Sequence, residues 1–211
     1  MLFRSLAVKP QVAPAVLAEI GPAMHPGQVL LSIVAGLPSQ TIAAFLPDGV
    51  GIIRAMPNAP ALIGAGVTGV SLGEGPGRED LALAVLAPLG RVVFVPERML
   101  DAVTGLSGSG PAYVALFAEA MIEAGVKLGL ARSVAAELTV QTLLGAARLL
   151  AEGEAPATLR ERVTSPGGTA ACGLYVLERG GLRAAVIEAV TAAAERAAEL
   201  GTKIDVRGER P

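Results

Sequence analysis

The chain has 211 residues, of which 52% are hydrophobic and 17% are charged, and its formal net charge is -2. This length allows one large domain or two small ones with real cores, and the composition excludes intrinsic disorder. The charge is nearly balanced, no basic stripe is present, and the two tyrosines and four phenylalanines are scattered. We therefore expect no nucleic-acid partner.

The residues that most often bind metals or act as nucleophiles are almost missing. Cys172 is the one cysteine and His25 is the one histidine. A lone cysteine excludes a disulfide framework and a cysteine-based metal site. His25 lies in a proline-rich stretch that is typical of an exposed loop. The sequence therefore predicts neither a bound metal nor a histidine-based triad.

Two uncharged segments, residues 26–47 and 55–73, are long enough to cross a membrane. Glycine, proline and polar residues interrupt both, so we interpret them as buried strands joined by turns. The first residues, Met1–Leu6, lack the pattern of a signal peptide because their one charge lies inside the apolar stretch. We expect a cytoplasmic protein without a membrane partner.

The first half of the chain alternates short apolar runs with helical segments. Strands are expected at residues 2–8, 29–35, 51–55, 67–72 and 91–95, and helices at 11–24, 41–46 and 80–89. Strands that alternate with helices predict an α/β fold with a doubly wound, Rossmann-like and largely parallel sheet.

A literal G-x-G-x-x-G occurs at Gly64–Gly69 within this half. A dinucleotide-binding motif of this kind follows a strand, begins a helix and has an acidic residue about 20 positions later. Here the motif follows a proline-rich loop and leads into β-branched residues, and the position 20 residues after its end is Leu89. We interpret it as a flexible loop that enters a strand.

After about residue 97 the β-branched runs stop and helical periods rich in Ala, Leu and Glu begin. Helices are expected at 109–128, at 133–151 and at 182–200, the last ending at Gly201. A capping box at Thr158–Glu161 predicts the start of a short helix between them. The sequence therefore predicts a partial α/β domain over 1–97 and an all-helical domain over 98–211.

The helical part carries many small residues at helical spacing. They are Ala135, Ala136, Gly145, Ala146, Ala147, Ala189, Ala192, Ala193 and Ala197. Small side chains allow helices to approach closely. They are consistent with ordinary packing inside one chain or with a helical dimer interface.

Two glycine-rich loops, Ser107–Pro111 and Thr164–Thr169, each precede a predicted helix. The amides at a helix N-terminus are unpaired and carry a partial positive charge, so such a loop can hold a carboxylate without an arginine. The hydroxyls of Ser165 and Thr169 would add donors. The alternative is plain helix capping, for which Ser, Thr, Gly and Pro are also favoured.

Four segments of the chain resemble motifs of the pyrroline-5-carboxylate reductase family, in the same order and spacing. They are Ala7–Gln11, Arg54–Pro60, Asp101–Tyr113 and Val163–Thr169. The resemblance implies reduction of the cyclic imine 1-pyrroline-5-carboxylate to L-proline, the last step of proline biosynthesis, with NADPH or NADH as cofactor. It also implies a homodimer or larger homo-oligomer in which the active site is completed across a dimer.

The resemblance also assigns roles to individual positions. The residues expected beside the cofactor are Val8, Lys9, Pro10, Ala35, Gly36, Asn58 and Ser109. The residues expected to form the substrate site are Ser165, Gly167, Gly168, Thr169 and Ala170. No acid–base residue is required, because the imine nitrogen carries its own proton and positioning with a bound cofactor supplies the rate.

The sequence departs from the family pattern at two places. The family begins with a strand, a glycine-rich turn and a helix that this chain lacks, so we expect about 60 residues to be missing through a truncated gene model. In the substrate loop, many family members have a second hydroxyl at the position of Ala170.

Two other functions compete with a reductase of proline synthesis. The first is a catalytically impaired fragment that acts only as a helical dimerisation module and binds small acids. The second is a related reductase of hydroxy acids, which would rely on a lysine within a helix. Lys127 lies at the end of a predicted helix, which disfavours that possibility.

Overall fold

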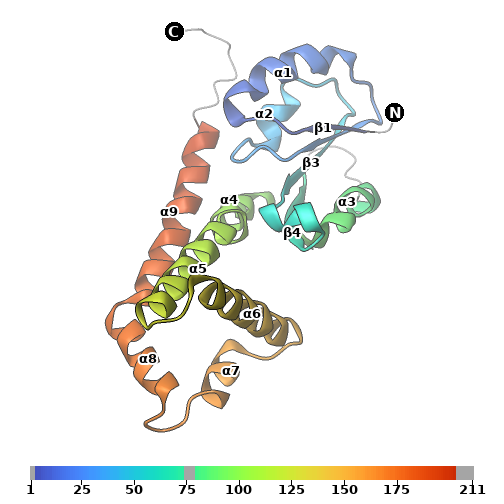
Figure 1. Ribbon diagram of the computed structural model, residues 1–211. Helices are drawn as coiled ribbons and strands as arrows, with labels where there is room; N and C mark the ends of the chain where they lie inside the picture. Colours follow the sequence, from blue (N-terminus) through green and yellow to red (C-terminus); the bar gives the residue numbers. More distant parts are fainter. Residues whose placement is uncertain (1–2, 74–78, 203–211) are drawn as a thin grey trace. The chain divides into compact units, whose positions relative to one another are not determined.

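The protein is described here by a computed structural model that covers residues 3–73 and 79–202 (Figure 1). Leu2 and residues 203–211, which belong to the first predicted strand and to the predicted helical domain, lie outside the described residues. The chain divides into two compact units. The sheet unit consists of residues 1–111 and 189–211, and the helical unit consists of residues 112–188.

The described part of the sheet unit contains a five-stranded sheet with the strand order β1-β2-β3-β4-β5. The strands are β1 (Phe3–Leu6), β2 (Val29–Ser32), β3 (Gly51–Met56), β4 (Gly66–Leu72) and β5 (Gly90–Phe94). All neighbours are parallel except β3 and β4. The exception arises because only a short 3₁₀ helix, Ala59–Ile63, joins these two strands, whereas a parallel connection needs a longer crossover. The predicted, largely parallel sheet is confirmed.

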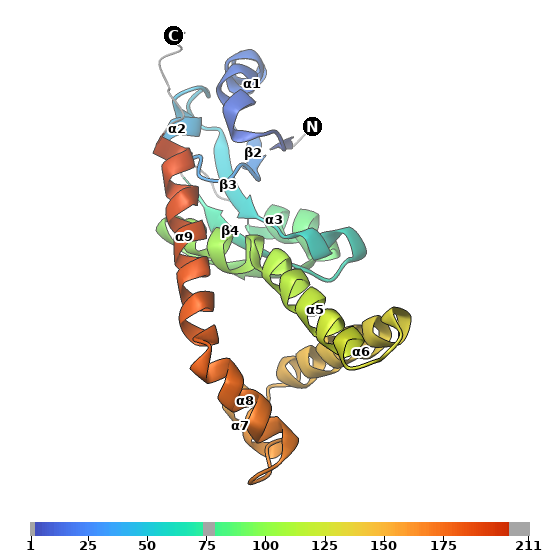
Figure 2. The same cartoon turned by 60° about the vertical axis from the view of Figure 1, so that its left-hand side comes forward.

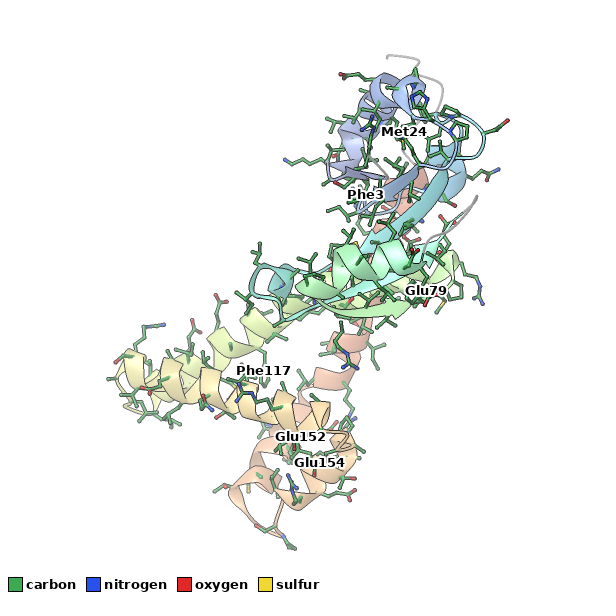
Figure 3. The ribbon with its side chains drawn as sticks, turned by 90° about the vertical axis from the view of Figure 1, so that its right-hand side faces the viewer. Phe3, Met24, Glu79, Phe117, Glu152 and Glu154 are labelled. Atoms are coloured by element: carbon green, nitrogen blue, oxygen red, sulfur yellow. The ribbon has the colours of Figure 1, made fainter. Side chains whose placement is uncertain are left out.

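Hydrophobic layers cover both faces of the sheet. One layer contains Leu30 and Ile52 together with residues of α1 (Ala13–Ile20) and α2 (Ser39–Ala43). Met24, labelled in Figure 3, lies in this layer and is 1% exposed. The other layer contains Leu31 and Ile53 together with residues of α3 (Glu79–Leu86). Alternate residues of β2 and β3 thus enter opposite layers, which explains why these strands are apolar throughout.

The uncharged segments 26–47 and 55–73 each contain a strand, as predicted, together with a short helix. The first contains β2 and α2, and the second contains the end of β3, the 3₁₀ helix and β4. The glycine motif Gly64–Gly69 leads into β4 rather than into a helix, so its rejection as a nucleotide motif is confirmed. The single helix predicted over 11–24 is wrong, because α1 ends at Ile20 and is flanked by two 3₁₀ turns. Pro22 lacks an amide donor and cannot continue the helix.

Helices follow β5 without further strands in the described chain. They are α4 (Leu100–Val103), α5 (Gly110–Lys127), α6 (Arg132–Ala151), α7 (Pro156–Arg162), α8 (Thr169–Arg179) and α9 (Leu182–Thr202). The three long predicted helices are confirmed within two residues at each end. In the division into compact units, residues 98–111 and 189–202 belong to the sheet unit. The domain boundary between residues 97 and 98 stays a prediction.

Two details of the predicted helices are wrong. The helix α7 begins at Pro156 after Ala155, so Thr158 lies inside it and caps nothing. Proline is favoured in the first turn, where its missing amide would have no partner. The helix α9 does not end at Gly201 but continues to Thr202. Glycine is required there for another reason, because a Cβ at this position would collide with the backbone of Gly36.

Among the described residues, one helix, α6, is long and apolar enough to cross a bilayer by length and composition alone. Only 11% of its most apolar 18-residue stretch is buried. Leu138, Val140 and Leu144 are each between 42% and 59% exposed. Some small residues of the helical part are packed and others are not. Ala135 packs against Gly125, whereas a Cβ at Gly145 would meet nothing within 4 Å. Within the described residues of the helical unit, this helix therefore has an exposed apolar surface.

Replacing Gly90 with alanine will lower the free energy of unfolding by about 3 kcal/mol. Gly90 has φ +136°, and a Cβ there would lie 2.6 Å from the backbone nitrogen of its cross-strand partner Gly66. Urea unfolding of the purified variant measures the effect. Gly173→Ala is the control, because a Cβ in this helix meets nothing within 4 Å and alanine favours helices. A Gly90→Ala protein as stable as the control would contradict the strand geometry.

Candidate functional site

The carboxyl ends of β1, β2 and β3 meet at one edge of the sheet. Leu6, the last residue of β1, is opposite Ser32, which is opposite Arg54 in β3. Ligands of open α/β sheets bind beyond these strand ends. The register brings together most of the predicted cofactor residues. They are Val8, Lys9 and Pro10 after β1, Ala35 and Gly36 after β2, and Asn58 after β3.

The turn at Gly36 requires glycine for two reasons. Its φ is +73°, a conformation that L residues rarely adopt. A Cβ at this position would lie 2.5 Å from the carbonyl oxygen of Ala197 and 2.8 Å from the nitrogen of Gly201, both in α9. Figure 2 shows this end of α9 beside α2, which follows the turn. The predicted cofactor turn is therefore held by the last turns of α9.

Asn58 has a defined orientation at the end of β3. Its side-chain Oδ1 accepts a hydrogen bond from the backbone amide of Val67 at 2.9 Å. The residue is half-buried and precedes the 3₁₀ helix that joins β3 to β4. The NH₂ group of the same side chain is left to donate a hydrogen bond to a ligand.

Ser109 follows a π-helical turn over Thr104–Gly108, a feature that is frequent at functional sites. The amide of Ser109 donates to the carbonyl of Thr104 at 2.9 Å. A Cβ on Gly108 would lie 2.8 Å from the Cε of Met56, the last residue of β3. The segment Ser107–Pro111 therefore lies against the end of β3 and leads into α5. The predicted open loop is wrong, because the π-helical turn continues almost directly into α5.

A hydrogen-bonded cluster beside the Gly36 turn was not predicted from the sequence. Glu97 accepts hydrogen bonds from the amide of Ser39 at 2.6 Å, from the hydroxyl of Ser39 at 2.5 Å and from Nη1 of Arg54 at 2.9 Å. Ser39 is 4% exposed and Arg54 is 7% exposed. One signal was available, because Arg54 is the one charge in an otherwise apolar strand and a buried arginine needs a partner.

The surroundings of Glu97 lower the pKa of its carboxyl group. Partial burial raises this pKa, but the hydrogen bonds from Ser39 and the guanidinium of Arg54 outweigh burial. The net direction is downward. The cluster therefore keeps Glu97 ionised opposite Arg54 over a wide pH range.

Replacing Glu97 with glutamine will destabilise the protein at neutral pH, and the difference from wild type will shrink as the pH falls below about 4. The pKa of Glu97 is lower in the folded than in the unfolded chain. Ionised Glu97 thus stabilises the fold at pH values above its pKa in the unfolded chain. This stabilisation is lost as the pH falls through its pKa in the folded chain. Urea unfolding of both proteins at about pH 7 and about pH 3 measures this. A difference independent of pH would contradict the ionised cluster.

The loop between α7 and α8 contains the predicted substrate residues and lies in the helical unit. Gly167 has φ +69°, and the amide of Gly168 donates to the carbonyl of Ser165 at 3.0 Å. Gly168 is the residue before α8, and no side chain caps this helix. Ser165 and Gly167 are exposed and Gly168 is half-buried. No Ser or Thr side chain caps α8, but Gly168 occupies the N-cap, so plain helix capping stays an alternative to carboxylate binding.

Thr169 and Ala170 are the first two residues of α8. Their amides belong to the first turn, where donors have no partner within the helix. The partial positive charge of a helix N-terminus favours an anion such as a carboxylate at this place. The preceding helix is held by an ion pair between Arg162 and Glu154, which is labelled in Figure 3, at 2.9 Å. The loop can thus present backbone donors to a small acid.

The structure brings the predicted site residues together in two groups. The strand-end residues and Ser109 lie in the sheet unit, and the Ser165–Ala170 loop lies in the helical unit. The glycine turn, the strand ends and the oriented Asn58 amide suit an extended dinucleotide, which binds along such an edge. Among the residues that the structure describes, no three His, Cys, Asp or Glu side chains are grouped to hold a metal ion.

Known proteins resemble this chain over almost its whole length. A family model described as pyrroline-5-carboxylate reductase dimerisation matches residues 97–200. A pyrroline-5-carboxylate reductase of Synechocystis sp. is 50% identical over 202 residues, which cover 94% of this chain and 74% of the relative. Pyrroline-5-carboxylate reductase 3 of Danio rerio is 44% identical, with 94% and 70% covered.

Solved structures give the same result. The Plasmodium falciparum pyrroline carboxylate reductase with NADP bound has a TM-score of 0.89 and 33% identity, covering 95% of this chain and 77% of its own. The Coxiella burnetii pyrroline-5-carboxylate reductase has a TM-score of 0.87 and 39% identity, covering 94% and 75%. Both the sequences and the folds agree with the resemblance of the four motifs. The chain belongs to the pyrroline-5-carboxylate reductase family.

Proposed function

We propose that the protein reduces 1-pyrroline-5-carboxylate to L-proline with NADPH or NADH. Family membership supports this reaction, and a relative of known structure has NADP bound. The observation that carries the proposal is the uncapped N-terminus of α8 behind the Ser165–Gly168 turn, which offers backbone donors to a carboxylate. We favour this function over a non-catalytic module because the residues predicted to bind the cofactor follow neighbouring strand ends.

The residues of the chain position the reactants. The Ser165–Thr169 turn would hold the carboxylate of the substrate through backbone amides, and the ring would extend from it. Val8–Pro10, Ala35–Gly36 and Asn58 would hold the cofactor at the strand ends, with Ser109 beside them. A reduced nicotinamide held there would supply the hydride for the imine carbon. The imine nitrogen already carries its proton, so orientation is the main contribution of the protein.

We further propose that the protein works as a homodimer or larger homo-oligomer in which the helical parts pair. The family model that matches residues 97–200 is a dimerisation model. The apolar surface of α6 needs a cover, and a second copy supplies one of matching chemistry. We also propose a cytoplasmic location, as expected from the sequence.

The direct test mixes purified protein with NADPH and 1-pyrroline-5-carboxylate. We expect loss of absorbance at the nicotinamide wavelength with an equal yield of L-proline, identified by mass spectrometry. A protein that forms no proline at any enzyme concentration would overturn the proposal. Light scattering in solution gives the oligomer, and a monomer would contradict the paired helices.

Replacing Ala170 with threonine will raise kcat/KM for 1-pyrroline-5-carboxylate by about tenfold, because a hydroxyl can then reach the imine nitrogen. Steady-state kinetics measure the change. Ala171→Thr is the control, since the next position on α8 is turned by about 100°. If both variants behave alike, position 170 does not face the substrate ring.

A further inference from the structure

We propose that Glu97 is a positioning residue that fixes the Ala35–Gly36 turn for cofactor binding without touching the cofactor. The proposal deepens the function proposed above and rests on the assignment of this turn to the cofactor. The contacts of Glu97 all lie within the sheet unit. They connect three segments that are far apart in the sequence, namely the start of α2, the middle of β3 and the chain after β5.

Both oxygens of the Glu97 carboxylate are engaged. Oε1 accepts from the amide of Ser39 and from Nη1 of Arg54, and Oε2 accepts from the hydroxyl of Ser39. Ser39 is the first residue of α2. The preceding Pro38 has no side-chain acceptor for the amides of this helix. Glu97 therefore supplies from a distant segment the acceptor that the first amide of α2 lacks locally.

Fixing Ser39 also fixes the cofactor turn, because only two residues separate it from Gly36. Leu37 is 0% exposed and belongs to the core layer under α1 and α2. Pro38 has φ -67°, which its ring locks. The other side of the turn is in contact with Ala197 and Gly201 of α9. Gly36 is thus held between α9 and a short, stiff link to the Glu97 cluster.

Arg54 makes the cluster sensitive to the charge of Glu97. It is 7% exposed, and its Nε has no hydrogen-bond partner among the described residues. Gly36, Pro38, Arg54 and Glu97 line a pocket of about 520 Å³. Without the carboxylate, the guanidinium would turn toward this space and the start of α2 would lose its acceptor. Hydrogen bonds to Glu97, rather than burial alone, keep the turn in one conformation.

The test compares Glu97→Gln, Ser39→Ala and the control Glu178→Gln. Ser39→Ala removes one hydrogen bond and leaves the Glu97–Arg54 pair intact. Glu178 is a matched control, since it is also paired with an arginine, Arg183, but is exposed at the end of α8. NADPH binding is titrated through the fluorescence of the reduced nicotinamide, and thermal unfolding is recorded for each protein.

We expect the dissociation constant of NADPH to rise about tenfold in Glu97→Gln and about threefold in Ser39→Ala. The KM for 1-pyrroline-5-carboxylate should stay within about twofold of wild type, and Glu178→Gln should bind NADPH as wild type does. If Glu97 had a purely structural role, the substitutions would lower the melting temperature and would change the dissociation constant of NADPH and the KM for 1-pyrroline-5-carboxylate alike. If Glu97→Gln fails to fold, the affinity of Ser39→Ala for NADPH tests the proposal instead.

Two negative results have different meanings. If wild type oxidises NADPH and the folded variants bind it with unchanged affinity, the positioning role of Glu97 is wrong and the proposed reaction stands. If wild type neither binds nor oxidises NADPH, the proposed function is wrong and the role of Glu97 fails with it.

Discussion

Replacing Gly168 with alanine will lower kcat/KM for 1-pyrroline-5-carboxylate by about 100-fold, as expected for the loss of a preorganised donor set. Gly168 precedes α8 and closes the turn by donating to the carbonyl of Ser165. A Cβ there would lie 3.1 Å from that carbonyl oxygen and would collide with the hydroxyl of Ser165. The amides behind the turn would then be displaced from the carboxylate.

The measurement is steady-state kinetics with both substrates varied. Gly173→Ala is the control, because it lies in the same helix and a Cβ there meets nothing within 4 Å. The dissociation constant of NADPH should not change in either variant. Unaltered kinetics in a correctly folded Gly168→Ala protein would show that the turn does not hold the substrate.

Replacing Gly36 with alanine will weaken NADPH binding by about 100-fold and lower the free energy of unfolding by about 3 kcal/mol. The substitution places a side chain at a positive φ and brings a Cβ to 2.5 Å from the carbonyl oxygen of Ala197. Either the turn or α9 must move. Fluorescence titration of NADPH and urea unfolding measure the two effects.

Gly27 provides a matched control in the same unit. Its φ is +84°, close to that of Gly36, but a Cβ there meets nothing within 4 Å. Gly27→Ala should therefore cost only the backbone strain, about 1 kcal/mol, and leave NADPH binding intact. If Gly27→Ala and Gly36→Ala have equal effects, packing against α9 has no role in the cofactor turn.

The fold followed from the sequence where periodicity was decisive. Apolar runs separated by helical segments located the five described strands. The signal was clearest for β2 and β3, since a strand covered on both faces is apolar almost throughout. The antiparallel pairing of β3 and β4 could not be predicted in this way, because strand direction depends on the connection rather than on the strands. Similarly, Gly201 matches a helix end by composition, but its contact with Gly36 is long-range.

The sequence predicted some parts of the candidate site and missed others. The strand-end residues and the Thr164–Thr169 loop follow from strand ends, helix starts and the family resemblance. The Glu97 cluster does not, because Ser39 and Arg54 lie 58 and 43 residues before Glu97 and no local pattern connects them. An arginine in an apolar strand indicates that a partner exists, but the identity of that partner depends on the fold.

The central claim is that backbone amides at the start of α8 bind the carboxylate of a small amino acid. A crystal structure of the protein with L-proline tests it most directly. We predict that the carboxylate lies at the Ser165–Thr169 turn, about 3 Å from the amide nitrogens of Thr169 and Ala170. Proline bound at another place, or a turn that excludes it, would contradict the account.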